Sequence, residues 1–417
     1  MRIAIVGAGV SGLVAAHLLH REHEITVFEA AAHAGGHTNT VRVDTPYETH
    51  HVDTGFIVFN DRNYPCFERL LARLRVPSQP STMSFSVSDG LGDFEYSGAS
   101  ANGLFANRRH LAEPWFHRMV ADLARFHRAA RELLAGADGS PAGLSLGDWL
   151  ERRRFSRAFI DRLIVPQASA VWSADPRQMW SFPARFLAEF FDHHGMLGFR
   201  DRPRWRVVRG GSARYVEALT RPFASRVRLG TSVRAVRRDP DGVLVTPQGG
   251  EPERFDEVIL ATHSDQALGL LEDAGERERE ILGAIPYQVN EAVLHTDVRV
   301  LPRRRRAWAS WNYHWQPEPS PQTTVTYHMN RLQSLRAERE FCVTLNRAGS
   351  IDPDRVIRRL SYAHPVFTDA GVRAQRRVTE IDGRRHTHFC GAYWGWGFHE
   401  DGVRSALRVG ERFGARL

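Results

Sequence analysis

A glycine motif in the first twelve residues constrains the fold more than any other feature of this chain. The apolar segment Ile3–Val6 runs directly into Gly7-x-Gly9-x-x-Gly12, and an apolar helical pattern follows over residues 11–20. In such a strand–turn–helix unit the first glycine permits a tight turn, the second lets the backbone approach a pyrophosphate, and the third lets helix and strand pack closely. A second strand-like segment, Glu24–Phe28, ends at Glu29, near the spacing of a carboxylate that hydrogen-bonds a ribose hydroxyl. The sequence therefore predicts a Rossmann-type dinucleotide site.

Length and composition narrow the chemistry further. A chain of 417 residues favours two domains, because single cores stop growing at roughly 250–300 residues. All 56 basic side chains counted as Lys and Arg are arginines, so Schiff-base chemistry, a lysine base and a P-loop lysine are excluded. Cys66, Cys342 and Cys390 are widely separated, which predicts reduced thiols and neither a disulfide framework nor a metal site.

The formal charge of +8 is compatible with a solvated arginine-rich surface or with an anionic partner. The densest cluster is Arg303–Arg306, and Trp308 follows it closely enough to sit at a lipid headgroup. We expect this cluster to bind an anionic membrane surface, more weakly as salt rises. Nucleic acid is not expected, since no binding motif accompanies the charge. Without a signal sequence or a 20-residue apolar run, the expected location is the cytoplasm, peripheral to the inner membrane face.

Along the chain, segments typical of a cofactor-binding domain alternate with segments assigned to a substrate domain. Helical spacing begins at Asn63, helices are expected over 115–134 and 146–163, and the aromatic-rich segment 180–191 is either core or the lining of an apolar substrate tunnel. Strands are expected over 226–237, 243–246 and 257–262, a sheet over 287–369, and a helix over 403–413. Because the chain comes back twice to cofactor-type sequence, we expect discontinuous domains: 1–62, 205–286 and 380–417 for the cofactor, and 63–204 and 287–379 for the substrate.

Several strings carry a resemblance to a known superfamily. Besides the N-terminal motif they are Gly35–Thr40 (GGHTNT), Asp53–Asn60 (DTGFIVFN), Ala261–Gln266 (ATHSDQ) and Tyr393–Gly402 (YWGWGFHEDG). The chain resembles the flavin-containing amine oxidases, protoporphyrinogen oxidases and phytoene desaturases. Within them it is most similar to bacterial NAD/FAD-binding proteins encoded beside cyclopropane-fatty-acid-synthase-like methyltransferases. The resemblance implies an α/β chain with a Rossmann-type, glutathione-reductase-like FAD-binding domain, a discontinuous α+β substrate domain, and non-covalent FAD.

The resemblance also implies which residues hold FAD. The pyrophosphate, ribose, ribityl, ring, adenine and pyrimidine contacts would come from Gly7, Gly9, Val10, Ser11, Gly12, Glu29, Ala30, Gly35, Gly36, His37, Thr38, Gly55, Phe56, Val233, Ala261, Thr262, Gly391, Glu400, Asp401, Gly402 and Val403. Two positions depart from the family pattern: His33 replaces an arginine and Ala392 replaces an aspartate. A covalent link through His37 or Cys390 also remains open.

Three functions follow from this reading. The first is a dehydrogenase or desaturase that removes hydride from an unsaturated or methylated fatty acyl chain, with His399, Glu400, His37 and His263 as candidate proton acceptors. The second is oxidation of a hydrophobic amine, for which Tyr393, Trp394 and Trp396 could furnish a cage. The absence of lysine, and Phe398 at one cage position, disfavour it. The third is a flavin-binding partner of a lipid methyltransferase that does no chemistry itself.

Overall fold

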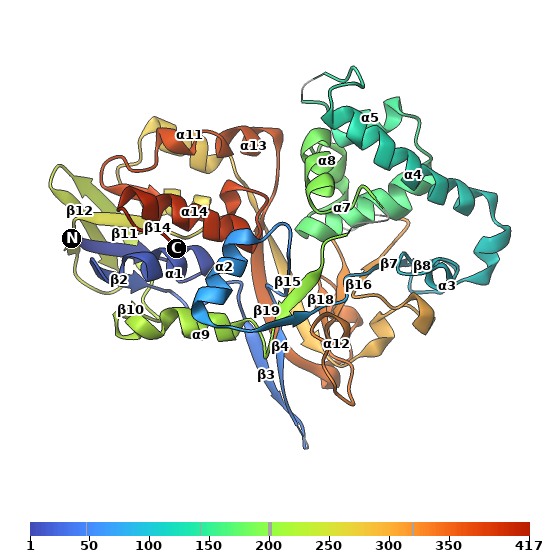
Figure 1. Cartoon of the computed structure of the whole chain (residues 1–417), viewed down its shortest axis with the longest axis horizontal. Helices are drawn as coiled ribbons and strands as arrows, with labels where there is room; N and C mark the ends of the chain where they lie inside the picture. The colour runs from blue at the N-terminus through green and yellow to red at the C-terminus, as the bar shows by residue number, and fades with distance from the viewer. Residues whose placement is uncertain (47, 142, 199–201, 319–320) are drawn as a thin grey trace.

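A five-stranded parallel sheet carries the N-terminal motif. The computed structural model describes residues 1–46, 48–141, 143–198, 202–318 and 321–417, and in it the strands lie in the order β10-β2-β1-β14-β20 (Figure 1). Every pairing in this sheet is parallel. The strands are β1 Arg2–Val6, β2 Glu24–Phe28, β10 Val227–Arg228, β14 Glu257–Leu260 and β20 Thr387–Phe389. Three distant parts of the chain thus build one sheet, and the predicted Rossmann-type fold is confirmed.

Four helices cover one face of this sheet. They are α1 Val10–Leu19, α2 Pro65–Leu74, α9 Ala213–Thr220 and α14 His399–Arg412. Their apolar side chains share one core with the sheet, and this core includes Phe67, Leu70 and Leu71 of α2. The helical spacing expected from Asn63 is present as α2, and its apolar side chains lie in this core.

The opposite face packs against a small antiparallel sheet and further helices. Their bounds are β11 Val233–Asp239, β12 Gly242–Pro247, β13 Glu253–Phe255, α10 Ser264–Leu270, α11 Glu276–Gly283 and α13 Asp369–Gln375. The hairpin expected before residue 243 is present, and Gly242 adopts a φ of +145° in it. The single strand expected over 226–237 is two strands, β10 and β11, because the chain turns at Gly230 with a φ of +62°.

A seven-stranded sheet dominates the second half of the molecule, as predicted for residues 287–369. Its order is β19-β15-β18-β17-β16-β7-β8, antiparallel except between β16 and β7, and β15 and β19 run through the middle of the molecule (Figure 1). The strands are β7 Phe85–Ser88, β8 Glu95–Ser97, β15 Tyr287–His295, β16 Trp311–His314, β17 Val325–His328, β18 Cys342–Leu345 and β19 Val356–Pro365.

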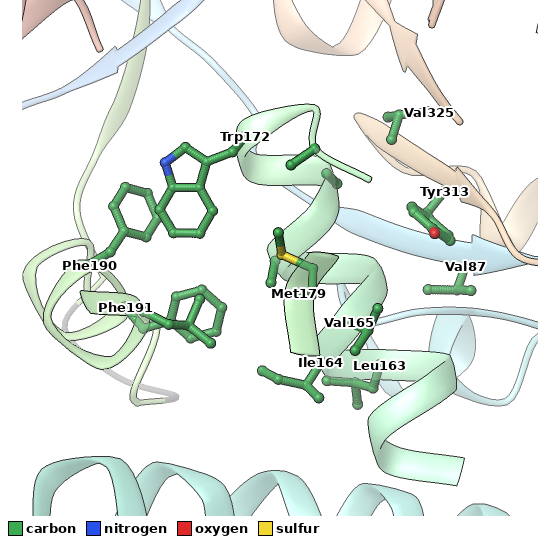
Figure 2. Packing of buried hydrophobic residues seen from close by; sticks show 14 of the residues in the cluster. Val87, Leu163, Ile164, Val165, Trp172, Met179, Phe190, Phe191, Tyr313 and Val325 are labelled. Atoms are coloured by element: carbon green, nitrogen blue, oxygen red, sulfur yellow. The ribbon is translucent and has the colours of Figure 1, made fainter. Parts of the chain in front are cut away.

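Helices pack on this sheet through an aromatic core. They are α3 Ala101–Leu104, α4 Pro114–Leu134, α5 Leu146–Arg152, α6 Arg157–Phe159, α7 Val165–Trp172 and α8 Ala184–His193. The helix expected over 115–134 is confirmed as α4. The helix expected over 146–163 is broken, because Arg154 adopts a φ of +52° and Ser156 caps a new helix. In Figure 2 side chains at the start of α7 and just before it lie between aromatic rings of α8 and apolar side chains of the sheet: Leu163, Ile164, Val165, Phe190, Phe191, Val87, Tyr313 and Val325.

Short elements join the two halves. They are the hairpin β3 Thr40–Asp44 and β4 Thr49–Asp53, the three-stranded sheet of β5 Val58–Asn60, β9 Trp205–Val208 and β6 Ser78–Pro80, and α12 Met329–Leu332. Within the described ranges, no helix has the length and apolar character that a bilayer span requires. In the same ranges, no group of three or more His, Cys, Asp or Glu side chains is arranged to hold a metal ion.

Candidate functional site

The turn between β1 and α1 has the geometry predicted for its three glycines. Gly7 adopts a φ of +103°, and a Cβ on Gly12 would lie 1.9 Å from the carbonyl oxygen of Gly7. A Cβ on Gly9 would meet no atom within 4 Å. Gly9 is also the N-cap of α1 and offers no side chain to the first-turn N–H groups. Those donors are therefore left for an anion that approaches over Gly9.

Glu29 lies at the end of β2, beside this turn. Its carboxylate accepts hydrogen bonds from the backbone N–H of Ala8 at 2.7 Å and of Ala31 at 2.8 Å. A carboxylate has about four lone-pair sites, so acceptor capacity remains for ribose hydroxyls. The Glu29 carbonyl accepts from the N–H of Thr231, which brings the start of β11 at Val233 next to the same strand end.

The paired glycines run alongside the turn. The N–H of Gly35 donates to the carbonyl of Ala8 at 2.8 Å, and a Cβ on Gly36 would lie 3.2 Å from the Cα of Gly9. The close approach and the φ of +57° both favour glycine at position 36. The side chain of His33, where the family has an arginine, is exposed.

The far end of the chain closes the same site. A Cβ on Gly402 would lie 2.7 Å from a methyl carbon of Val10 and 3.0 Å from Oγ of Ser11, so the N-termini of α14 and α1 lie together. Two helix N-termini in one place concentrate partial positive charge. Asp401 in the first turn of α14 accepts from the N–H of Phe398 at 3.0 Å, and burial raises the pKa of its carboxyl to about 6.

His399, a predicted proton acceptor, lies inside the protein. Its ring stacks on Phe56 with centroids 3.4 Å apart, and its Nε2 contacts the hydroxyls of Thr38 and Tyr215, each at 2.9 Å. Burial holds the pKa of His399 well below its usual value. These contacts fix the His399 ring in place and engage its Nε2 with two hydroxyls.

Glu400, a second predicted acceptor, caps another helix. Its carboxylate oxygens accept from the backbone N–H of Cys66 at 3.1 Å and of Phe67 at 2.9 Å, both in the first turn of α2. Tyr64, the N-cap residue of that helix, makes no side-chain capping bond. Glu400 therefore supplies the cap from α14 and ties the two helices, and these bonds engage both of its carboxylate oxygens.

Replacing Glu400 by alanine is expected to lower the free energy of unfolding by about 1–2 kcal/mol, the usual cost of a lost helix cap. Glu400→Gln keeps one acceptor oxygen and is expected to cost less. Chemical denaturation of both variants measures the difference. Equal stability of wild type and Glu400→Ala would contradict the capping role.

The remaining two candidates form a histidine cluster. The ring of His37 lies 5.8 Å from that of His263, 5.3 Å from that of His364 and 5.1 Å from that of Tyr362. Burial lowers the pKa of His37 and of His263 to about 4, and that of His364 to about 3. All three rings are neutral at pH 7, and each keeps some accessible surface. Sequence reasoning missed His364, which comes from β19, more than 300 residues beyond His37.

A second residue missed from the sequence is Asp53, although it precedes the predicted Gly55. Asp53 is fully buried and accepts from the Thr40 hydroxyl at 2.6 Å, from the N–H and hydroxyl of Ser212 at 2.8 Å each, and from the Gln333 amide at 3.0 Å. Burial raises the pKa of Asp53 to about 6. The carboxylate fixes the 53–56 segment against both halves of the molecule.

Aromatic side chains border the segment that leads into α14. The rings of Phe190 and Phe398 stack at 5.4 Å, those of Phe186 and Phe367 at 5.2 Å, and the indole N–H of Trp172 donates to the carbonyl of Trp396. We call this set, Trp172, Phe186, Phe190, Phe367, Trp396 and Phe398, the aromatic wall. Phe186 and Phe190 are buried whereas Trp396 and Phe398 are partly exposed, so the predicted segment is core on one side and borders accessible surface on the other.

The amine cage is not assembled from the three predicted rings. Trp394 packs against the core on the far side of the parallel sheet and lies under the guanidinium of Arg408, whereas Trp396 belongs to the aromatic wall. Tyr393 is buried. Cys390 is also fully buried in the core of the parallel sheet, and burial raises its pKa to about 12, which argues against a covalent flavin link there.

Comparison with known proteins agrees with this architecture. The family model described as "Flavin containing amine oxidoreductase" matches residues 10–412. A curated relative, the putative flavin-containing monoamine oxidase AofH of Mycobacterium tuberculosis, is 26% identical over 264 residues, which are 60% of this chain and 54% of the relative. The chain thus spans about half the length of that relative.

Solved structures resemble the whole chain. Cyclohexylamine oxidase from Brevibacterium oxydans IH-35A matches with a TM-score of 0.72 and 16% identity, covering 99% of both chains. A putative protoporphyrinogen oxidase from Exiguobacterium sp. 255-15 has a TM-score of 0.66 and 18% identity, and a CLA-producing fatty acid isomerase from P. acnes has 0.67 and 15%; each covers 99% of this chain and 98% of the other. At these identities the likeness establishes the fold.

Proposed function

The chain belongs to the flavin containing amine oxidoreductase family and uses FAD, and from that premise we propose that it dehydrogenates the hydrocarbon chain of a lipid acyl group, unsaturated or methylated. The observation that carries the proposal is the aromatic wall beside the N-terminus of α14. Apolar rings of this kind bind and orient a hydrocarbon chain and keep water away from it.

The residues present fit FAD. The open position over Gly9 and the uncapped first turn of α1 suit a pyrophosphate, and Glu29 keeps lone pairs for a ribose. The converging N-termini of α1 and α14 favour negative charge on the bound group.

Dehydrogenation moves a hydride from one carbon to the flavin and a proton from the neighbouring carbon to a protein base, so that one C=C bond forms. His37 suits the second task. Its Nε2 lies 3.1 Å from the carbonyl of Ala363, which can only accept, so Nε2 carries the proton and Nδ1 keeps a free lone pair. The low pKa of His37 keeps the ring neutral before the reaction. His263 and His364, also neutral, place no positive charge beside a hydrocarbon.

Amine oxidation is the second candidate. The M. tuberculosis relative, a putative flavin-containing monoamine oxidase, and the structurally similar cyclohexylamine oxidase favour it. Two observations weigh against it: Trp396 lies in a different cluster from Trp394, and the chain has no lysine.

Anaerobic reduction of the bound flavin separates the two functions. We expect the visible flavin bands to bleach with phospholipids that carry unsaturated or methylated chains and to persist with a panel of hydrophobic amines. Bleaching by amines alone would reject the lipid substrate.

Truncating the aromatic wall tests the same proposal from the protein side. Trp396→Ala is expected to lower kcat/KM for the acyl substrate about 10- to 100-fold, because the acyl chain loses a partly exposed ring of the wall that orients it. Phe155→Ala is the matched control, since Phe155 is buried in the same apolar cluster and packs on Phe126 and Phe159 rather than on the wall. It should change the melting temperature and leave kcat/KM within about threefold. Equal loss in both variants would assign the effect to packing alone.

A further inference from the structure

Two neighbouring segments and a third that is more than 200 residues away in the sequence meet around Gly92. Nη1 of Arg304 donates to the carbonyl of Gly92 at 2.6 Å, and the amide of Asn107 donates to the carbonyl of Asp93 at 2.7 Å. The turn 89–93, the short 3-10 helix Arg108–Ala112 and the arginine cluster 303–306 thereby form one surface, which we call the patch. It lies next to β8 and α3, at the end of the molecule opposite both termini (Figure 1).

Two leucines stand out from the patch. Leu91 is 67% exposed and Leu111 is 55% exposed, and they are two of the five large hydrophobic side chains exposed in the described part of the chain. The carboxylate of Asp89 accepts from the N–H groups of Leu91, Gly92 and Phe94, so the turn is held in one conformation. Leu91 is therefore presented to solvent by a fixed turn and not by a loose loop, which lowers the ordering cost of binding.

Arginines lie in the same segments as the leucines and in the cluster 303–306. Arg108, Arg109, Arg303, Arg305 and Arg306 are all exposed. Fewer acidic groups lie here: Asp89 accepts from backbone N–H groups of its own turn, Asp93 faces Arg109 at 4.0 Å, and Glu95 is fully buried and paired with Arg304 at 2.6 Å. A cavity of about 400 Å³ opens among Leu91, Gly92, Asp93, Arg109, Arg303 and Arg304.

Trp308 does not take part, contrary to the prediction from the sequence. It is only 9% exposed, because its indole N–H donates to the carbonyl of Pro302 at 2.7 Å and Arg305 stacks over its ring. The apolar groups available to a membrane at this surface are the leucines.

We propose that the patch docks the protein on a bilayer rich in anionic phospholipids. The arginines contact lipid phosphates, the cavity accommodates a headgroup, and the two leucines reach the acyl boundary. Exposed aliphatic side chains among arginines favour this partner over a nucleic acid, whose phosphate backbone offers leucine nothing to bury against. The proposal stands on the patch alone and is independent of which substrate the flavin oxidises.

Co-sedimentation with vesicles tests the docking. The flavin-loaded protein should bind phosphatidylglycerol-containing vesicles, and bind pure phosphatidylcholine vesicles at least tenfold more weakly, with an effect that shrinks as salt rises. The triple variant Arg109→Gln/Arg303→Gln/Arg305→Gln should lose on the order of 100-fold in partitioning, since each arginine near an anionic surface contributes about fivefold. Leu91→Ser/Leu111→Ser should lose about tenfold.

Matched controls separate the patch from bulk charge and bulk hydrophobicity. Arg73→Gln/Arg237→Gln/Arg279→Gln removes the same charge from exposed sites elsewhere, and Leu229→Ser/Val289→Ser removes two other exposed apolar side chains. Both should bind within about threefold of wild type, and all variants should keep their flavin and melting temperature. Equal loss in the two arginine triples, no vesicle binding by wild type, or displacement by a DNA duplex with no effect of the leucine change would each overturn the proposal.

Discussion

Gly9→Val will fold and will not hold FAD. The φ of −75° at Gly9 suits valine, and a Cβ there meets no protein atom within 4 Å, so the apoprotein has room for the side chain. The same space is the approach to the first-turn N–H groups of α1, and a branched side chain would keep a pyrophosphate away from them. We expect the Kd for FAD to rise at least 100-fold, measured by quenching of flavin fluorescence, with the melting temperature of the apoprotein unchanged.

Gly12→Val is the contrasting variant. A Cβ at Gly12 would lie 1.9 Å from the backbone oxygen of Gly7, which cannot move without displacing the turn, so this variant is expected not to fold stably. The pair distinguishes a glycine required by the ligand from a glycine required by the fold. If Gly9→Val bound FAD as tightly as wild type, this turn would not be the pyrophosphate site.

Features that depend on neighbouring residues were predictable from the sequence. The glycine motif, Glu29 at the end of β2 and the apolar spacing of α4 are each set by the local backbone, and all three lie as expected. The Gly35-Gly36 loop could also be predicted to approach a ligand, because few other structures require two successive glycines.

Roles that depend on distant partners were not predictable. Glu400 caps a helix more than 330 residues earlier in the chain, and nothing near it in the sequence indicates that partner. Histidine is a residue type that often accepts protons in catalysis, yet the ring of His399 is buried against Phe56. Trp308 closely follows four arginines and is nevertheless buried; its hydrogen bond to Pro302 is local, and it is the burial of the ring that the sequence does not show. Burial and long-range hydrogen bonds determine the roles of these residues, and neither of them leaves a periodic residue pattern in the sequence.

Acid will unfold this protein steeply, because many of its histidines are buried in the neutral form. Burial lowers the pKa to about 4, or to about 3 for one of them, in six histidines: His37, His127, His194, His263, His295 and His364. The contacts show why for His295. Its Nδ1 accepts from the N–H of Asp297 at 3.0 Å while its Nε2 contacts the Thr344 hydroxyl at 2.8 Å, so a second proton would remove the acceptor.

The direction of the pH effect follows from which state binds more protons. Between pH 6.5 and about 4 these histidines are protonated in the unfolded chain and neutral in the folded one, so their stabilisation is present above pH 6.5 and is lost as pH falls. Asp53 and Asp401 act in the opposite direction, since their raised pKa values of about 6 favour the folded state below that pH. Burial also holds the pKa of His314 and of His399 well below its usual value, so the histidines with lowered pKa outnumber these two carboxyls. Unfolding near pH 5 is then expected to take up several protons, and each proton taken up costs about 1.4 kcal/mol per pH unit.

Urea unfolding of the protein at pH 7.5, 6.5 and 5.5 measures this slope. We expect the midpoint to fall steeply below pH 6.5. His295→Gln keeps a donor for Thr344 and an acceptor for the Asp297 N–H but cannot be protonated, so it should reduce the slope by about one proton. His33→Gln is the control, because the His33 side chain is exposed and should leave the slope unchanged. A stability that stays flat from pH 7.5 to 5.5, or an equal change in both variants, would show that the buried histidines do not govern acid unfolding.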